Sequence, residues 1–370
     1  MQKARFKKSW KWYWIAFIPV QWAVYRLLQN HSVFVEEYYS RGIYPTLSSV
    51  LRTLFSWIPF SFGQWLFYLM IAYIIWQVFR LTKKLIRSQK ARLAVLGKGL
   101  MSFFAYFSII YLIFNVLWGL NYSREPLQQS LDLTVLEPDQ ARLEALCRHL
   151  INTCNELREN TMKDVEHRNN MSSNTSLFAK AEMSYASASL HYELFKYSSP
   201  SIKAVAVPQI MSFAGIGGIY FPFTGEANIN THPPRFKLPF TICHEMAHQL
   251  GFASETEANF IAYLVCRSSP DTFFQYSGNL AAMRYSMSAL YRIDSMAYRE
   301  LSKSYSEDIQ ADLKENREYW QRFRSPFEDI SHSINDLFLK ANGQEDGVKT
   351  YGKMVDLLLA DYAVNHALQQ

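Results

Sequence analysis

The stretch from Thr241 to Cys266 reads TICHEMAHQLGFASETEANFIAYLVC, and the interpretation of the whole chain starts from it. It contains His244, Glu245 and His248 in the order His-Glu-x-x-His. Residues four apart lie on one face of an α-helix, so the two histidines can direct their imidazoles at one metal ion. Glu245 follows the first histidine and can act as general base on a water at that metal. The stretch therefore predicts a helix that carries a zinc site.

A third ligand is predicted from the residues that follow. Gly251 can end the first helix in a left-handed conformation, which lets the chain double back. A second helix then begins near Ser254, with Ser254 or Thr256 as its amino-terminal cap. On this helix Glu255 and Asn259 share a face with two alanines, which permits close packing against the histidine helix. We expect Glu255 to bind the metal and Asn259 to orient a ligating histidine.

Glu257 is the alternative third ligand. Its face of the second helix continues through Phe260 and Ile261, which is typical of a buried core rather than of a metal cleft. This packing argument favours Glu255 and leaves both glutamates open.

The charge distribution divides the chain into two unequal parts. Residues 1–119 hold 15 Lys and Arg against 2 Asp and Glu, whereas residues 120–370 hold 23 against 30. A basic, aromatic amino-terminal third before a mildly acidic remainder predicts a membrane region, residues 1–122, followed by a globular domain, residues 123–370. The basic residues flank apolar runs instead of lining one face, so nucleic acid is not expected as a partner.

Three apolar runs predict transmembrane helices at about residues 12–28, 57–79 and 100–120. No signal-peptide cleavage site follows the first run, which is preceded by a basic amino terminus. Residues 80–99, between the other two runs, carry seven Lys and Arg and no acidic residue. The positive-inside rule then places the amino terminus and this basic loop in the cytoplasm. The sequence thus predicts a multi-pass protein of the bacterial cytoplasmic (inner) membrane, with its globular domain on the periplasmic side and the lipid bilayer as a partner.

The globular domain is predicted to be mainly α-helical with a small β element. An apolar stripe over residues 143–157 predicts a first helix, and a second is expected over residues 177–196. Residues 202–210 and 216–223 are rich in β-branched and aromatic side chains and are punctuated by Gly and Pro. These two runs predict short strands or a hairpin. From about residue 270 to 370 the pattern is helical.

The cysteines do not predict a disulfide framework or a cysteine zinc site. No Cys-x-x-Cys pair occurs in the chain. A bridge between Cys243 and Cys266 is geometrically conceivable, but two buried thiols are the favoured interpretation.

The motifs together resemble the gluzincin-type zinc peptidases. Three features carry the resemblance: His-Glu-x-x-His at 244–248, Glu-x-x-Ala-Asn at 255–259, and the short strands before them. Ste24/HtpX-like membrane peptidases have a similar Glu-x-x-Ala-Asp, and ImmA/IrrE-like peptidases a similar Glu-x-Glu-Ala-Asn run. The resemblance implies a zincin-like α+β metallopeptidase fold with zinc ligands at His244, His248 and Glu255, and Glu245 as base. Three spans before such a domain also resemble an uncharacterised family of bacterial envelope proteins, which implies no substrate.

Two features depart from these families. Only six residues separate His248 from Glu255, fewer than gluzincins usually have. The compact spacing of metzincins is closer, but it would put the third ligand at Ser254. Residue 259 is Asn where the Ste24-like motif has Asp. These departures bear on the subclass of peptidase and not on the metal.

The sequence as a whole predicts a membrane-anchored zinc peptidase. Glu245 would take a proton from the attacking water and pass it to the leaving amine. The strand around residues 214–223 could pair with an extended protein or peptide substrate, which makes Gly217, Gly218 and Tyr220 candidate substrate-binding residues. The alternative is a catalytically inactive zinc-binding envelope protein that acts as a scaffold or sensor. The sequence indicates neither the substrate nor the oligomeric state.

Overall fold

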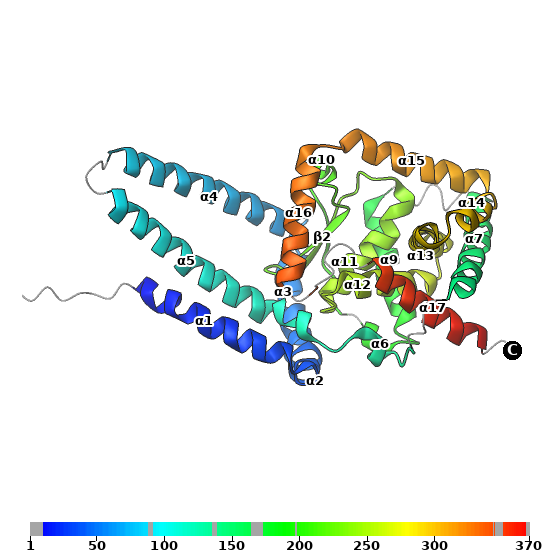
Figure 1. The fold of residues 1–370 in the computed structure, drawn as a ribbon, viewed down its shortest axis with the longest axis horizontal. Coiled ribbons are helices and arrows are strands. Elements are labelled where there is room, and N and C mark those ends of the chain that lie inside the picture. Colours follow the sequence, from blue (N-terminus) through cyan, green and yellow to red (C-terminus); the bar gives the residue numbers. More distant parts are fainter. Residues whose placement is uncertain are drawn as a thin grey trace, which may run out of the picture.

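The computed structural model describes residues 10–87, 92–134, 139–163, 173–196, 198–342, 344 and 351–367. These residues are mainly helical and include one three-stranded sheet, as predicted for the fold class. Figure 1 shows two long helices, α4 (Phe62–Arg87) and α5 (Arg92–Leu117), that project from a globular part, with α1 (Trp10–Gln29) running beside α5.

Helices α4 and α5 are long and apolar enough to span a membrane. Each has 26 residues, which corresponds to about 39 Å and exceeds the ~30 Å of a bilayer's hydrocarbon core. Their most apolar windows are only 11% and 17% buried, so most of their side chains face outward. Helix α1 coincides with the first predicted run, and its crossing of a membrane remains a prediction.

The predicted second span, 57–79, begins too early. Residues 57–61 form a bend that contains Pro59, and α4 starts only at Phe62. The carboxylate of Glu226 in the sheet accepts the backbone N–H groups of Phe62 at 3.1 Å and of Gly63 at 2.5 Å. Because these donors have no partner within the helix, Glu226 fixes where α4 begins.

The segment between α1 and α4 is helical and packs on the globular part. It consists of α2 (Ser32–Phe34), the π-helix η1 (Val35–Ile43) and α3 (Tyr44–Ser56). After α5 the chain continues through η2 (Gly119–Ser123) and α6 (Leu127–Ser130).

Both predicted runs contain a short strand, but the two strands do not pair with each other as a hairpin. The strands of the sheet are β1 (Ile202–Ala204), β2 (Gly218–Phe221) and β3 (Glu226–Ile229), in the order β1-β3-β2. Strand β3 was not predicted, and it pairs parallel to β1 and antiparallel to β2. The predicted strand 202–210 ends at Ala204 because Pro208, which fits the first turn of a helix, begins α10 (Pro208–Phe213).

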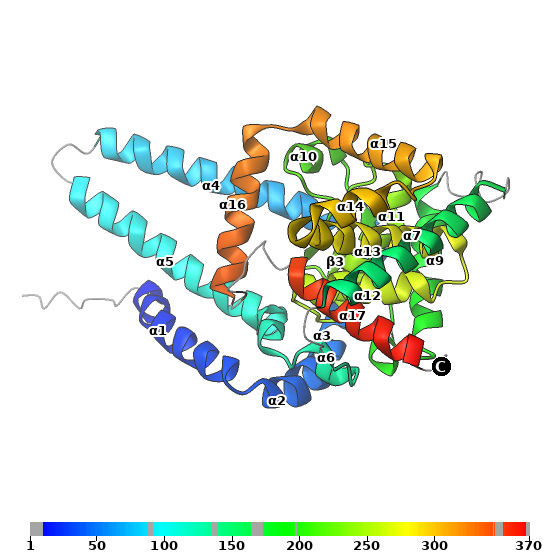
Figure 2. The ribbon, with the colours of Figure 1, turned by 45° about the vertical axis from the view of Figure 1, so that its right-hand side comes forward.

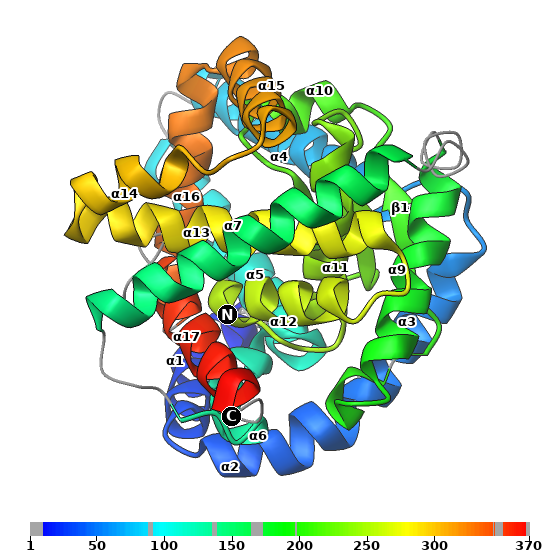
Figure 3. The same cartoon turned by 90° about the vertical axis from the view of Figure 1, so that its right-hand side faces the viewer.

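The remaining helices pack on the sheet and against one another. Helix α7 (Gln140–Lys163) lies along α13 (Thr272–Ile293), as Figure 3 shows, and buries the predicted apolar stripe. Helix α9 (Asn174–Ala188) is shorter than predicted because the chain turns there to bury Phe195. The other elements are η3 (Glu193–Phe195), η4 (Arg235–Lys237), α14 (Ser295–Ser302), α15 (Glu307–Phe323), α16 (Pro326–Ala341) and α17 (Tyr351–Ala367).

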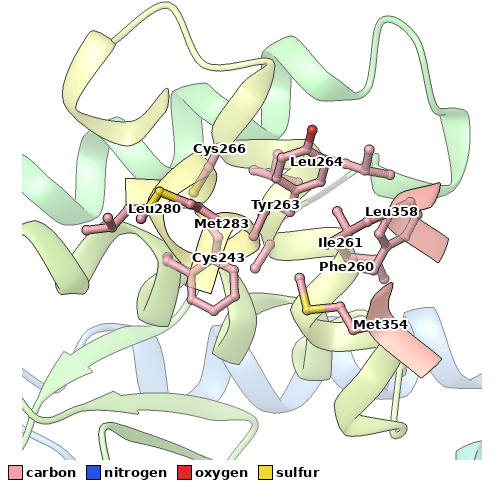
Figure 4. Close-up of a cluster of buried hydrophobic side chains, with 14 of the residues drawn as sticks. Cys243, Phe260, Ile261, Tyr263, Leu264, Cys266, Leu280, Met283, Met354 and Leu358 are labelled. Atoms are coloured by element: carbon pink, nitrogen blue, oxygen red, sulfur yellow. The ribbon is translucent and has the colours of Figure 1, made fainter. Parts of the chain in front are cut away.

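The core of the globular part is built on α11 (Leu238–Gln249) and α12 (Glu255–Arg267). Figure 4 shows α12 packed between α13 and α17, with Phe260 of α12 near Leu358 of α17. Cys243 and Cys266 meet in this core, and all four cysteines are free thiols. The core thus holds α11 and α12 at a fixed angle to each other.

Candidate metal centre

His244, His248 and Glu255 come together between α11 and the first turn of α12, and their ligand atoms all lie within 4.8 Å of one another. The two histidine Nε2 atoms are 3.1 Å apart. The Glu255 carboxylate oxygens lie 3.3 Å from Nε2 of His244 and 3.6 Å from Nε2 of His248. Donor atoms of a tetrahedral zinc site with bonds of 2.0–2.1 Å lie about 3.3 Å apart. The closest approaches among the three side chains are near this spacing, with one Glu255 oxygen toward each histidine.

The tight return from α11 to α12 depends on Gly251, whose φ is +85° as its predicted role requires. A Cβ at this residue would lie 2.7 Å from Cε1 of Tyr44 and 2.9 Å from Oδ1 of Asn121. Ser254 then caps α12 by accepting the backbone N–H of Glu257. The return is short enough to make Glu255 the first residue of α12 and to bring it back over α11.

His248 is held in one tautomer. Its Nδ1 lies 2.7 Å from the carbonyl oxygen of Phe252, and because a carbonyl only accepts, Nδ1 carries the proton. The lone pair of Nε2 is then free to bind a metal. Burial also lowers the pKa of His248 to about 4, so the imidazole is neutral near pH 7.

Glu255 and His244 form the charged half of the cluster. Burial opposes charge on both and is the largest single effect, but the hydrogen bond between them and the attraction of the neighbouring charged groups together outweigh it. The pKa of Glu255 falls to about 2, and that of His244 is raised. Asn259 is also among the groups that raise the pKa of His244, yet the buried Nδ1 of His244 has no hydrogen-bond partner of normal geometry among the described residues. Asn259 thus lies beside His244, as its expected role requires.

Of the two glutamates that the sequence left open, Glu255 is the one beside the histidines. Glu257 points instead to α6, where its carboxylate accepts the backbone N–H of Leu127 at 2.6 Å. Burial raises the pKa of Glu257.

Glu245 is buried between the cluster and strand β2, with 4% of its surface exposed. The backbone N–H of Tyr220 donates to its carboxylate, and burial raises its pKa to about 8. The fit against β2 is close, since a Cβ added to Gly218 would lie 2.5 Å from Oε1 of Glu245. A Cβ on Gly217 would meet only Thr241, at 3.6 Å. Gly218 therefore leaves the space that Glu245 occupies.

The side chain of Tyr220 is used for packing. Its ring centroid lies 5.4 Å from that of Trp118, and its hydroxyl lies 3.4 Å from the hydroxyl of Tyr44. Tyr220 contacts Glu245 through its backbone N–H.

Several supporting residues come from the amino-terminal third and were missed by the sequence analysis. The carbonyl oxygen of Gln249, at the end of α11, accepts from Tyr44 at 3.0 Å, Ser48 at 3.0 Å and Arg52 at 3.1 Å. These donors satisfy a carbonyl that the helix end leaves without a partner. Their separation from Gln249, about 200 residues, leaves no local pattern that could have revealed them.

Trp118 and Tyr122, which both follow α5, also lie beside the candidate metal centre. Trp118 donates from Nε1 to the carbonyl oxygen of His248 at 3.1 Å, and its ring meets the imidazole edge to face. Tyr122 interacts electrostatically with Glu255, and burial holds the pKa of Tyr122 well above its usual range. The cluster of His244, His248 and Glu255 thus borders residues from both sequence regions.

An ion pair ties the return after α11 to η1. Arg124 binds both carboxylate oxygens of Glu36, at 2.8 and 2.9 Å, and donates to the carbonyl oxygen of Gly251 at 3.0 Å. Its guanidinium also lies over the ring of Phe252, 4.0 Å from the centroid. Because Phe252 orients His248, this pair supports the cluster indirectly.

The model of one protein family, described as a protein of unknown function (DUF3810), matches residues 39–359. The match begins in η1, ends in α17 and includes all three residues of the metal cluster. No curated protein and no solved structure matches the chain.

Proposed function

The chain belongs to the DUF3810 family of unknown function, and from that premise we propose that it is a membrane-anchored zinc-dependent peptidase. One observation carries the proposal: two imidazoles and a carboxylate converge within 4.8 Å beside the buried carboxyl group of Glu245. Three protein ligands leave a fourth position for water or substrate, which is the arrangement of catalytic rather than structural zinc sites.

Each residue of the site has a role in the proposed reaction. His244, His248 and Glu255 would hold the ion, with Asn259 beside His244. Zinc in this site would supply a Lewis acid that brings the pKa of a water to about 7. Glu245 would accept the proton of that water and return it to the leaving amine. Its burial, and the N–H that it accepts from Tyr220, keep the carboxylate in position.

The sheet supports a zincin-like arrangement around these residues. Within the described sheet, β2 pairs only with β3, so one of its edges is not used in the ladder. An extended peptide can add to such an edge through its backbone. Substrate would then lie along Gly217, Gly218 and the backbone of Tyr220, next to Glu245.

The proposal is tested by metal content and turnover of the purified full-length chain in mild detergent. We expect about one zinc ion per chain and hydrolysis of casein or a peptide mixture. Chelation should abolish hydrolysis, and added Zn²⁺ should restore it. A protein without zinc would contradict the metal site. Bound zinc without hydrolysis would instead favour a scaffold or sensor.

A Gly218→Ala substitution is expected to lower peptide hydrolysis strongly while zinc stays bound. The new methyl group would overlap both Cγ and the carboxylate of the buried Glu245 side chain and displace it. Gly97→Ala is the control, because Gly97 lies outside the proposed site and a Cβ there would have no atom within 4 Å. Equal activity of the two variants would show that Glu245 does not need its observed position.

We further propose that α1, α4 and α5 all cross the cytoplasmic membrane and leave the globular part in the periplasm. The basic residues before α1 and those at the end of α4 and the start of α5 support this orientation. Because the native cysteines are buried, an introduced cysteine can be probed alone. An impermeant maleimide should label Glu300→Cys from the periplasm and Lys83→Cys only after lysis. The reverse pattern would invert the orientation.

A further inference from the structure

Helix α16 carries an exposed apolar stripe. Phe327, Ile330, Ile334 and Leu337 are exposed by 49%, 54%, 63% and 68%. Their spacing of three and four residues puts them on one face of the helix. Such a stripe of exposed apolar side chains needs a partner of its own.

Both ends of α16 are fixed to the protein by other side chains. Near its carboxyl end, Phe338 packs edge to face on Phe114 of α5 and on Tyr122, with ring centroids 5.9 and 6.1 Å apart. Near its amino end, Glu328 lies against Gly215, where a Cβ would be 3.2 Å from Cγ of Glu328. The helix therefore spans from α5 to the loop before β2.

The position of α16 relative to α4 and α5 indicates what covers the stripe. Figure 2 shows α16 lying across both helices, on the side of the globular part from which they project. Phe114 lies three residues before the end of α5, or about 5 Å along the axis. The contact of Phe338 with Phe114 thus places α16 where α5 emerges from the hydrocarbon core. At this level the outward faces of α4 and α5 meet lipid.

We propose that α16 is an interfacial helix whose stripe inserts into the lipid bilayer at the surface where α4 begins and α5 ends. The other side chains agree with this arrangement. Leu339 faces the protein and is 2% exposed, whereas Asp329, Ser333 and Lys340 are exposed on the remaining side. Helices at the membrane surface divide in this way between lipid, water and protein. The acidic residues in α16 outnumber its one lysine, so the contact depends on apolar area and not on anionic lipid.

The same helix borders the metal centre. It runs from the Gly215 loop, just before β2, to Tyr122, which interacts with Glu255. Figures 1 and 2 both show it on the membrane side of α11 and α12. If the proposed peptidase function holds, on which this step rests, the substrates are protein segments that lie at the bilayer surface next to a membrane anchor.

The lipid contact is tested with spin labels on the full-length chain in phosphatidylcholine nanodiscs. Labels on Ile334→Cys and Leu337→Cys should collide several-fold more with oxygen, which dissolves in lipid, than with a water-soluble nickel chelate. Ser333→Cys and Asp329→Cys, on the same helix, are the matched controls and should show the reverse. Equal access to nickel at all four positions would overturn the proposal. So would disulfide-linked dimers of Leu337→Cys, because a second copy would then cover the stripe.

The substrate class is tested separately. The double variant I334E/L337E should cleave a lipid-anchored reporter peptide in the same nanodisc several-fold more slowly, and the soluble form of that peptide at the wild-type rate. Equal rates on the two forms, whether lowered or not, would contradict the substrate class. The spin-label result does not depend on zinc or turnover, so failure of the proposed function and failure of the lipid contact can be told apart.

Discussion

A Glu245→Gln substitution is expected to leave zinc bound and to lower peptide hydrolysis by a factor of about 10²–10⁴. Glutamine has nearly the shape of glutamate and can still accept the N–H of Tyr220, so the buried position stays filled. It cannot take a proton from water. The measurement is zinc content and initial rate on the same purified sample, because only their separation distinguishes a lost base from a lost metal.

The control for this experiment is Glu257→Gln. Glu257 is partly buried and also accepts a backbone N–H, that of Leu127, but it does not lie with His244, His248 and Glu255. The variant should keep both zinc and activity. Unchanged turnover in Glu245→Gln, with zinc still bound, would remove the general base and return the protein to the scaffold or sensor alternative.

The second large effect is expected at the metal itself: His248→Ala should lose its zinc on dialysis. The imidazole is neutral, oriented by the carbonyl of Phe252, and nearly buried, so alanine removes a preformed ligand. Removal of Glu255 as Glu255→Ala should also release the metal, because its oxygens lie within 3.6 Å of both histidines.

Metal analysis of the same series decides between the two glutamates. Zinc that survives Glu255→Ala but not Glu257→Ala would reverse the assignment of the third ligand. Folding of each variant can be followed by thermal unfolding in detergent. A variant that unfolds at the same temperature as the zinc-free wild type has lost only the site.

The parts of the site that could be predicted from the sequence are those fixed by local geometry. The four-residue spacing of His244 and His248, the left-handed Gly251 and the cap at Ser254 all act within one helix turn or one loop. The placement of Glu255 followed from a comparison of helix faces, which is also a local argument.

The parts that could not be predicted depend on contacts between distant residues. Strand β3 has polar side chains at Glu226 and Asn228, which argue against a buried strand, yet both are buried. Glu226 accepts the first N–H groups of α4, and Asn228 hydrogen-bonds Ser61. These partners precede β3 by more than 160 residues, so no local pattern indicates them.

The bond between Glu226 and the start of α4 also sets how far the proposed site can move from that helix. Strand β3 holds the first two residues of α4, and its neighbour β2 touches Glu245, so the sheet links the start of α4 directly to Glu245. A domain on a long linker can search a wide volume for its targets. If the proposed function holds, Glu245 would act at a constant height above the membrane, and a peptide bond would have to come to that height to be cut.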